Sequence, residues 1–292
     1  MKKYIAGLII LLFGFTPVFA QDEAEAKPKD KPVRTPFEHS LLIDNQTCLI
    51  HPKNTLEWVI QHRFGTMDNG IKDIYGLYAP GANIRNGFNY SIMDNVQIGY
   101  GLTLKNMYSD FNLKWAALQQ TRENTMPVAV TLYANMAIDG RNKSVFGTEY
   151  KSSNRLSYFS QVIVGRKFND WFTLQATGSF THFNSTDSTG NHDVFGVGFN
   201  GRIKFSPQSS FVFQYDIPLK IQSISEQKDF EVAKPNFGIG YEVSTGYHAF
   251  QIYITSSNGI LPQELYMNNG FDLSNGFSDL MFGFTITRLW GF

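Results

Sequence analysis

The chain has 292 residues with 25 basic and 25 acidic side chains, and this neutral balance provides no basic face for a nucleic-acid partner. Aromatic residues make up 15% of the chain, yet the mean hydropathy is −0.21. A soluble domain so rich in aromatic residues would show longer buried apolar runs, whereas a membrane β-barrel needs apolar residues only at alternate positions. The single cysteine, Cys48, excludes an intramolecular disulfide, and we interpret it as a small apolar residue.

Residues 1–20 have the organisation of a secretory signal peptide. Lys2 and Lys3 precede an apolar run over residues 4–15, and residues 18–20 (VFA) end as a signal peptidase requires. A spanning helix needs about 20 apolar residues, so a retained anchor is the weaker interpretation. We expect export with cleavage of this peptide.

Residues 21–54 form the expected periplasmic N-terminal segment. The first part, 21–36 (QDEAEAKPKDKPVRTP), is charged and spaced by prolines, and we expect a flexible tail. The second part, 37–54, contains the run SLLIDNQTCLI, which could pack against the interior of a barrel or its periplasmic mouth. It is a candidate plug.

From residue 55 to residue 292 the chain is a series of segments with a period of two, which is the pattern of β-strands. In the clearest one, Val96, Ile98 and Tyr100 lie on one face, opposite Gln97 and Thr103. We expect about twelve antiparallel strands in an all-β transmembrane barrel. The expected segments are 56–64, 83–90, 96–104, 111–116, 127–138, 154–168, 171–183, 195–205, 210–217, 236–243, 249–255 and 279–292.

A soluble β-sandwich is the alternative, and two features favour the membrane. One face of each segment is aromatic and apolar, while the other is Gly, Thr, Gln, Asn and charge, which is too polar for a soluble core. The connections also alternate in length, as short periplasmic turns and long external loops do. Two connections depart from this alternation. Residues 105–108 should be external but are short, and residues 118–126 should be periplasmic but are longer.

The chain ends in a strand whose last aromatic residues have one parity. Counting back in twos from Phe292 gives Trp290, Arg288, Ile286, Phe284, Phe282 and Leu280 as a lipid-facing row. A terminal strand that ends in a lipid-facing aromatic residue is similar to the signal that outer-membrane assembly machinery binds. We therefore expect Trp290 and Phe292 to act as an assembly signal, with the barrel-assembly machinery and the lipid and lipopolysaccharide of the membrane as partners.

Several stretches resemble a Bacteroidota β-barrel family filed as domain of unknown function 5777. They are TLEWVIQHRFGTMDNGIKDIYG, ANIRNGFNYSIMDNVQIGYG, FNLKWAALQQ, MPVAVTLYAN and the terminal GFTITRLWGF. The His-Arg-Phe-Gly and Asn-Ile-Arg elements are the most specific parts. The resemblance covers most of the barrel and implies an outer-membrane location in a Gram-negative bacterium, but it transfers no activity.

The sequence gives little support for an enzyme. Outer-membrane lipid hydrolases use a Ser-His pair on the outer face of the barrel. His62 and His182 have the outward parity, but no matching serine accompanies them, and Ser160 should lie deeper in the membrane. The other histidines (His39, His51, His192 and His248) are scattered without the spacing of a metal site, so we expect no catalytic residue, metal or cofactor.

Charged side chains with inward parity are candidates to line the lumen. We predict this place for Glu57, Arg63, Arg85, Asp110, Lys114, Arg155, Lys167, Arg202, Lys204, Asp216 and Glu242. They could pair with one another in a closed barrel, or their basic excess could favour anionic solutes in a channel. A barrel of about twelve strands has a backbone radius near 12 Å, which leaves a narrow pore unless a plug fills it.

Three functions therefore remain open. The first is a narrow pore for small polar or anionic solutes. The second is a non-conducting structural or docking barrel, with a protein partner at the N-terminal segment or the external loops. The third and weakest is a lipid-modifying enzyme.

Overall fold

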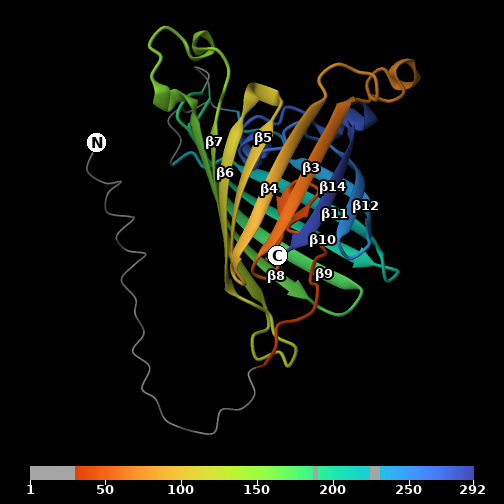
Figure 1. Cartoon of the computed structure of the whole chain (residues 1–292). Coiled ribbons are helices and arrows are strands. Elements are labelled where there is room, and N and C mark those ends of the chain that lie inside the picture. The colour runs from red at the N-terminus through yellow and green to blue at the C-terminus, as the bar shows by residue number, and fades with distance from the viewer. Residues whose placement is uncertain (1–29, 187–189, 224–230) are drawn as a thin grey trace.

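Twelve antiparallel strands close into a barrel in the part of the chain that the computed structural model describes, residues 30–186, 190–223 and 231–292 (Figure 1). Consecutive strands pair with each other, and β14 pairs with β3 to complete the ring. The predicted antiparallel barrel is confirmed. Its strands are β3 (Thr55–Thr66), β4 (Asn83–Met93), β5 (Val96–Thr103), β6 (Ser109–Leu118), β7 (Ala129–Ile138), β8 (Leu156–Lys167), β9 (Phe172–Phe183), β10 (Asp193–Lys204), β11 (Ser209–Leu219), β12 (Asn236–Ser244), β13 (His248–Thr255) and β14 (Met281–Gly291).

The two faces of the barrel differ as the alternation predicts. On β5, Gln97 and Thr103 point inward and are only 1% and 4% exposed, whereas Ile98 and Leu102 point outward and are 45% and 51% exposed. Side chains alternate between the faces of a strand, so each strand has a polar row toward the lumen and an apolar row toward lipid. This arrangement is the reverse of a soluble β-barrel.

The connections at the two ends of the barrel differ in length (Figure 1). Short turns at one end join β4 to β5, β8 to β9, β10 to β11 and β12 to β13, and this is the periplasmic end. Longer connections at the external end carry η1 (Gly70–Asp73), η3 (Lys143–Phe146), η4 (Ser152–Arg155), α2 (Pro262–Met267) and η5 (Leu273–Asp279). The two exceptions occur as expected, because η2 (Lys105–Met107) lies in a short external connection and residues 119–128 form a longer periplasmic one.

The N-terminal part enters the barrel from the periplasmic end, where it is red in Figure 1. The expected signal peptide and residues 21–29 of the expected tail lie outside the described residues. The rest of that tail is not free, because Val33 N–H donates to the carbonyl of Gln120 (2.8 Å) and Pro32 bridges to Thr121. The chain then continues into the lumen, where β1 (Leu41–Leu42) and β2 (Asn45–Gln46) form a small hairpin.

The terminal strand differs from its predicted row at one residue. Phe282, Phe284, Ile286, Trp290 and Phe292 do not point into the buried lumen, but Leu280 is 7% exposed and buried. The strand begins after Leu280, and its pairing with β3 shifts between Met281 and Gly283, so the alternation does not extend back to Leu280. Within the described residues we find no helix with the length and apolarity to cross a membrane.

Candidate functional site

We call residues 37–54 the lumen segment; it lies in the lumen as far as His51, and residues 52–54 are exposed at the periplasmic rim. Its apolar side chains are buried: Phe37, Leu42, Ile43 and Cys48 belong to one cluster with wall residues that include Tyr133, Phe159, Ile163, Val194, Val212 and Tyr253. Cys48 packs against Gly165, the one residue of β8 that has no side chain. A Cβ on Gly165 would lie 2.7 Å from Cys48 Sγ.

Glutamines of the wall bind the backbone of the lumen segment. Gln251 Oε1 accepts from Ile43 N–H (2.8 Å), and Gln251 Nε2 donates to the carbonyl of Leu41 (3.1 Å). Gln175 does the same for Cys48 N–H (3.1 Å) and the carbonyl of Gln46 (2.6 Å). A side-chain amide has both a donor and an acceptor, so one glutamine can satisfy two backbone groups that would otherwise be buried without partners.

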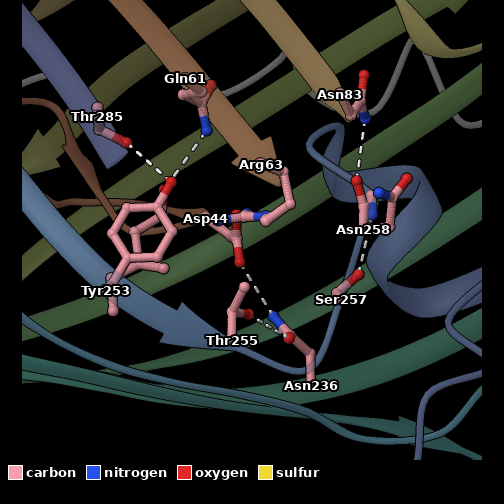
Figure 2. Close-up of polar contacts among 12 residues, drawn as sticks. Asp44, Gln61, Arg63, Asn83, Asn236, Tyr253, Thr255, Ser257, Asn258 and Thr285 are labelled. Atoms are coloured by element: carbon pink, nitrogen blue, oxygen red, sulfur yellow. Dashed lines mark hydrogen bonds and ion pairs between the residues drawn. The ribbon is translucent and has the colours of Figure 1, made fainter. Parts of the chain in front are cut away.

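Charged contacts attach the lumen segment to the wall at two positions along the barrel axis. Asp44 pairs with Arg63 of β3, and Figure 2 shows the same carboxylate facing Asn236, whose amide donates to it at 3.3 Å. Toward the periplasmic end, Glu38 accepts from Arg202 Nη1 (2.7 Å) and from Lys204 Nζ (3.2 Å). Both acidic groups of the segment therefore neutralise basic groups of the wall.

Other predicted lumen residues pair within the wall or bind backbone carbonyls. Arg85 and Asp110 form a bidentate pair, with Nε–Oδ1 at 2.9 Å and Nη2–Oδ2 at 2.7 Å. Lys114 Nζ donates to the carbonyls of Ser40 (3.0 Å) and Leu49 (3.2 Å). The pairing is a mixture of wall–wall and wall–segment contacts.

The predicted lumen residues lie in three places. Those that are buried inside the barrel are Glu57, Arg63, Arg85, Asp110, Lys114, Arg202, Asp216 and Glu242. Lys204 and Lys167 are partly buried at the periplasmic end, where Lys167 Nζ donates to the carbonyl of Arg34 (3.0 Å). Arg155 lies in η4, directly before β8, at the external mouth, where its Nε donates to Tyr150 Oη (2.7 Å).

A second insertion from the external end was not predicted. The loop between β13 and β14 turns into the barrel and forms α2, where Tyr266 Oη donates to Asp216 Oδ1 (3.2 Å) and Gln263 Nε2 donates to Asn135 Oδ1 (2.6 Å). A cavity of about 20 Å³ separates this loop from the lumen segment, which is room for about one water molecule. The lumen is thus filled from both ends.

An open cavity of about 890 Å³ lies on the external side of this loop. Its polar lining includes Lys105, Asp139, Arg141, Arg155 and Glu264. The Arg141 guanidinium donates to the Asp139 carboxylate (Nη2–Oδ2 2.6 Å), which raises the pKa of Arg141 above its ordinary value. The cavity therefore holds fixed charges of both signs.

Two histidines that are distant in the sequence, His39 and His51, lie close together in the structure. His39, His51 and Glu57 come together, fully buried, where the lumen segment meets the start of β3. On the outer face, His182 Nδ1 contacts Asp193 Oδ1 (2.7 Å) and its Nε2 contacts Asn184 Oδ1 (2.8 Å). Both ring nitrogens of His182 are thus engaged by groups other than a serine.

Comparison with known proteins agrees with this architecture. A family model described as a membrane-bound beta barrel domain (DUF5777) matches residues 37–290. No curated protein matches the chain.

Solved structures of outer-membrane barrels are similar in fold. The COG4313 outer membrane channel from Pseudomonas putida F1 has a TM-score of 0.50 and 12% identity, over 83% of this chain and 97% of that one. The KdgM porin has a TM-score of 0.46 and 4% identity, over 82% and 99%. Omp33, an outer membrane protein of Acinetobacter baumannii, has a TM-score of 0.39 and 9% identity, over 82% and 99%. The likeness to the COG4313 channel concerns the fold alone, because the identity is 12%.

Proposed function

The chain belongs to the membrane-bound β-barrel domain family DUF5777, and we propose that it is a gated outer-membrane pore for small polar or anionic solutes, closed in the conformation described above. The observation that carries this proposal is the polar wall around the lumen segment. Gln175, Gln214 and Gln251 bind the segment through amide groups that water could bind equally well. A net hydrogen bond contributes only about 1 kcal/mol when water competes for the same groups, so such contacts suit a segment that leaves and returns.

The charges of the segment support a preference for anions once the pore is open. Departure of the lumen segment removes Glu38 and Asp44, the partners of Arg202, Lys204 and Arg63. The lumen would then keep the basic groups of its wall and lose the two acidic groups of the segment. A narrow passage focuses the field of such charges, which favours anionic solutes.

The first test is the conductance of a planar bilayer that contains the purified chain. We expect the full-length protein to be nearly silent, and we expect a chain that lacks residues 37–54 to conduct. Since α2 remains in place in that deletion, its pore should be narrow. If neither form conducts in any salt, the gated-pore proposal is wrong.

A disulfide can lock the segment reversibly. Gly165→Cys places a second thiol opposite Cys48, with a Cβ–Cβ separation of 3.2 Å, close to the 3.5–4.5 Å that a disulfide spans. The residual openings of the nearly silent full-length protein should disappear in the oxidised variant, and a reductant should restore them. Gly165→Cys combined with Cys48→Ser is the matched control, which oxidation should leave unchanged.

A non-conducting docking barrel is the second candidate, and the observation in its favour is the external cavity of about 890 Å³ above a filled lumen. It predicts silence from both the full-length and the deleted chain. The same bilayer experiment therefore separates the two functions.

A further inference from the structure

Three potential metal ligands meet where the lumen segment joins the wall. His51 Nε2 lies 3.3 Å from Glu57 Oε1, and His39 Nδ1 lies 3.7 Å from the same oxygen. One ligand atom from each of the three residues lies within 4.8 Å of the others. Zinc binds histidine nitrogen at about 2.0–2.1 Å, so neighbouring ligand atoms in a tetrahedral shell lie about 3.3 Å apart. The cluster is thus close to the size of a zinc shell.

The His39 ring is a second, independent indication. Its residue is 1% exposed, and neither Nδ1 nor Nε2 has a hydrogen-bond partner. A buried polar group without a partner is costly, so its presence calls for a binding partner. The ring contributes its Nδ1 to the same group of ligand atoms as Glu57.

The surroundings hold the carboxylate in a fixed orientation. Ser40 N–H donates to Glu57 Oε1 (3.0 Å), while Asn89 Nδ2 donates to Oε2 (3.0 Å) and Ser40 Oγ also contacts Oε2. Such supporting hydrogen bonds to a ligand are typical of metal sites. Lys114 also faces this region, but its ammonium donates to the carbonyls of Ser40 and Leu49.

We propose that His39, His51 and Glu57 form a binding site for a divalent transition-metal ion, with zinc the best match, which ties the lumen segment to β3. Two histidines and one glutamate are a known zinc ligand set that leaves a fourth position for water. The two histidines belong to the segment and Glu57 belongs to the wall, so the ion would bridge the two. The inference concerns binding and does not depend on conduction.

Titration of the metal-free full chain in detergent with Zn²⁺, followed by calorimetry, tests the site. We expect one ion per chain. We expect His39→Gln and His51→Gln each to weaken zinc binding by at least about tenfold, because the loss of a residue that only supports a ligand already lowers metal affinity by about that factor. His182→Gln is the matched control and should bind as the wild type does. Both test positions lie outside the barrel strands, and heat-modified gel migration checks that the barrel has formed.

Cobalt and thiol labelling give two further readouts. Co²⁺ should give the visible absorption of a four-coordinate site in the wild type and not in His39→Gln. Zn²⁺ should slow the labelling of Cys48 by a maleimide, with recovery on EDTA, and should have no such effect in His51→Gln. Binding well below one ion per chain, equal affinity in His39→Gln, or loss of binding in His182→Gln would each overturn the proposal.

Discussion

Asp44 is the acidic residue of the lumen segment that pairs with a fully buried arginine of the wall. Its carboxylate pairs with Arg63 and accepts from Asn236 Nδ2 (3.3 Å; Figure 2), and it also accepts from Gln214 Nε2 (2.7 Å). Arg63 is fully buried and lies over the Tyr253 ring, 4.8 Å from its centroid. Removal of one partner leaves an uncompensated buried charge, which costs about 3–5 kcal/mol.

We therefore predict that Asp44→Ala shifts the lumen segment out of the barrel, where water can solvate Arg63. The measurement is the rate at which a maleimide labels the buried Cys48, which should rise at least about tenfold, since 1.4 kcal/mol corresponds to a factor of ten. Asp68→Ala removes a carboxylate from an exposed loop and should leave the rate unchanged. Equal rates in Asp44→Ala and the wild type would show that the ion pair does not hold the segment.

At the scale of elements, the inserted loop with α2 depends on small residues in β10. A Cβ on Gly196 would lie 2.2 Å from Cε1 of the Tyr266 ring, so alanine at this position cannot coexist with the ring as it is placed. Overpacking of this kind costs about 1–3 kcal/mol, and a loop can avoid that cost by moving away. The helix therefore occupies a space that the strand leaves free.

The corresponding prediction is that Gly196→Ala displaces the loop that carries α2. Limited proteolysis within residues 256–280 should become faster by roughly fivefold or more, the factor that corresponds to about 1 kcal/mol. Gly178→Ala on the neighbouring strand is the matched control, because its Cβ would have no atom within 4 Å. If the two variants are cleaved at the same rate, Tyr266 does not anchor the loop.

The strands and the candidate plug at residues 37–54 could be predicted from the sequence, but α2 and the contacts of the lumen segment could not. Alternation is a local property, so the inward position of Arg63 or Arg85 follows from the residues beside it. The partner of Arg202 is Glu38, 164 residues away, and no local pattern connects them. The resemblance to the family supplied the fold but carried no information about the lumen.

The missed elements are short and are stabilised by packing rather than by propensity. The helix α2 has six residues, too few to show a helical period, although Pro262 at its start is a signal of a helix N-terminus. His39 and His51 are far apart for a metal motif, and they meet because the β1–β2 hairpin reverses the chain at Ile43, which has a φ of 53°. The wall around an irregular segment determines where the chain of that segment reverses direction, and the local sequence carries no information about that wall.

At the scale of the whole molecule, the end of the chain closes the barrel seam. Phe292 N–H donates to the carbonyl of Asn54 (3.0 Å), and the ring is 79% exposed. The backbone contact therefore contributes to closure, while the side chain is exposed.

We predict that Phe292→Gln lowers the amount of barrel in the outer membrane, measured by heat-modified gel migration of membrane fractions. This substitution keeps the backbone hydrogen bond, so a defect would report on the ring alone. Phe292→Tyr retains an aromatic ring and should assemble as the wild type does. Normal assembly of Phe292→Gln would mean that the terminal aromatic residue is not the signal.

If the barrel conducts as proposed, we expect the charge of the wall to decide which ions pass once the lumen segment is absent. In the chain that lacks residues 37–54, Arg202 and Arg63 lose Glu38 and Asp44 and keep a positive field inside the barrel. We predict that this chain prefers anions, and that Arg202→Gln and Arg63→Gln each lower the permeability ratio of chloride to potassium, measured as a reversal potential. The loss should be smaller at 1 M than at 0.1 M salt, because the screening length falls from about 10 Å to about 3 Å.

Arg288→Gln removes the same charge from an exposed position in β14 and should not change the ratio. Should all three variants change the ratio equally, the preference arises from the overall charge of the protein, because a field confined to the lumen would respond to the two inward arginines alone.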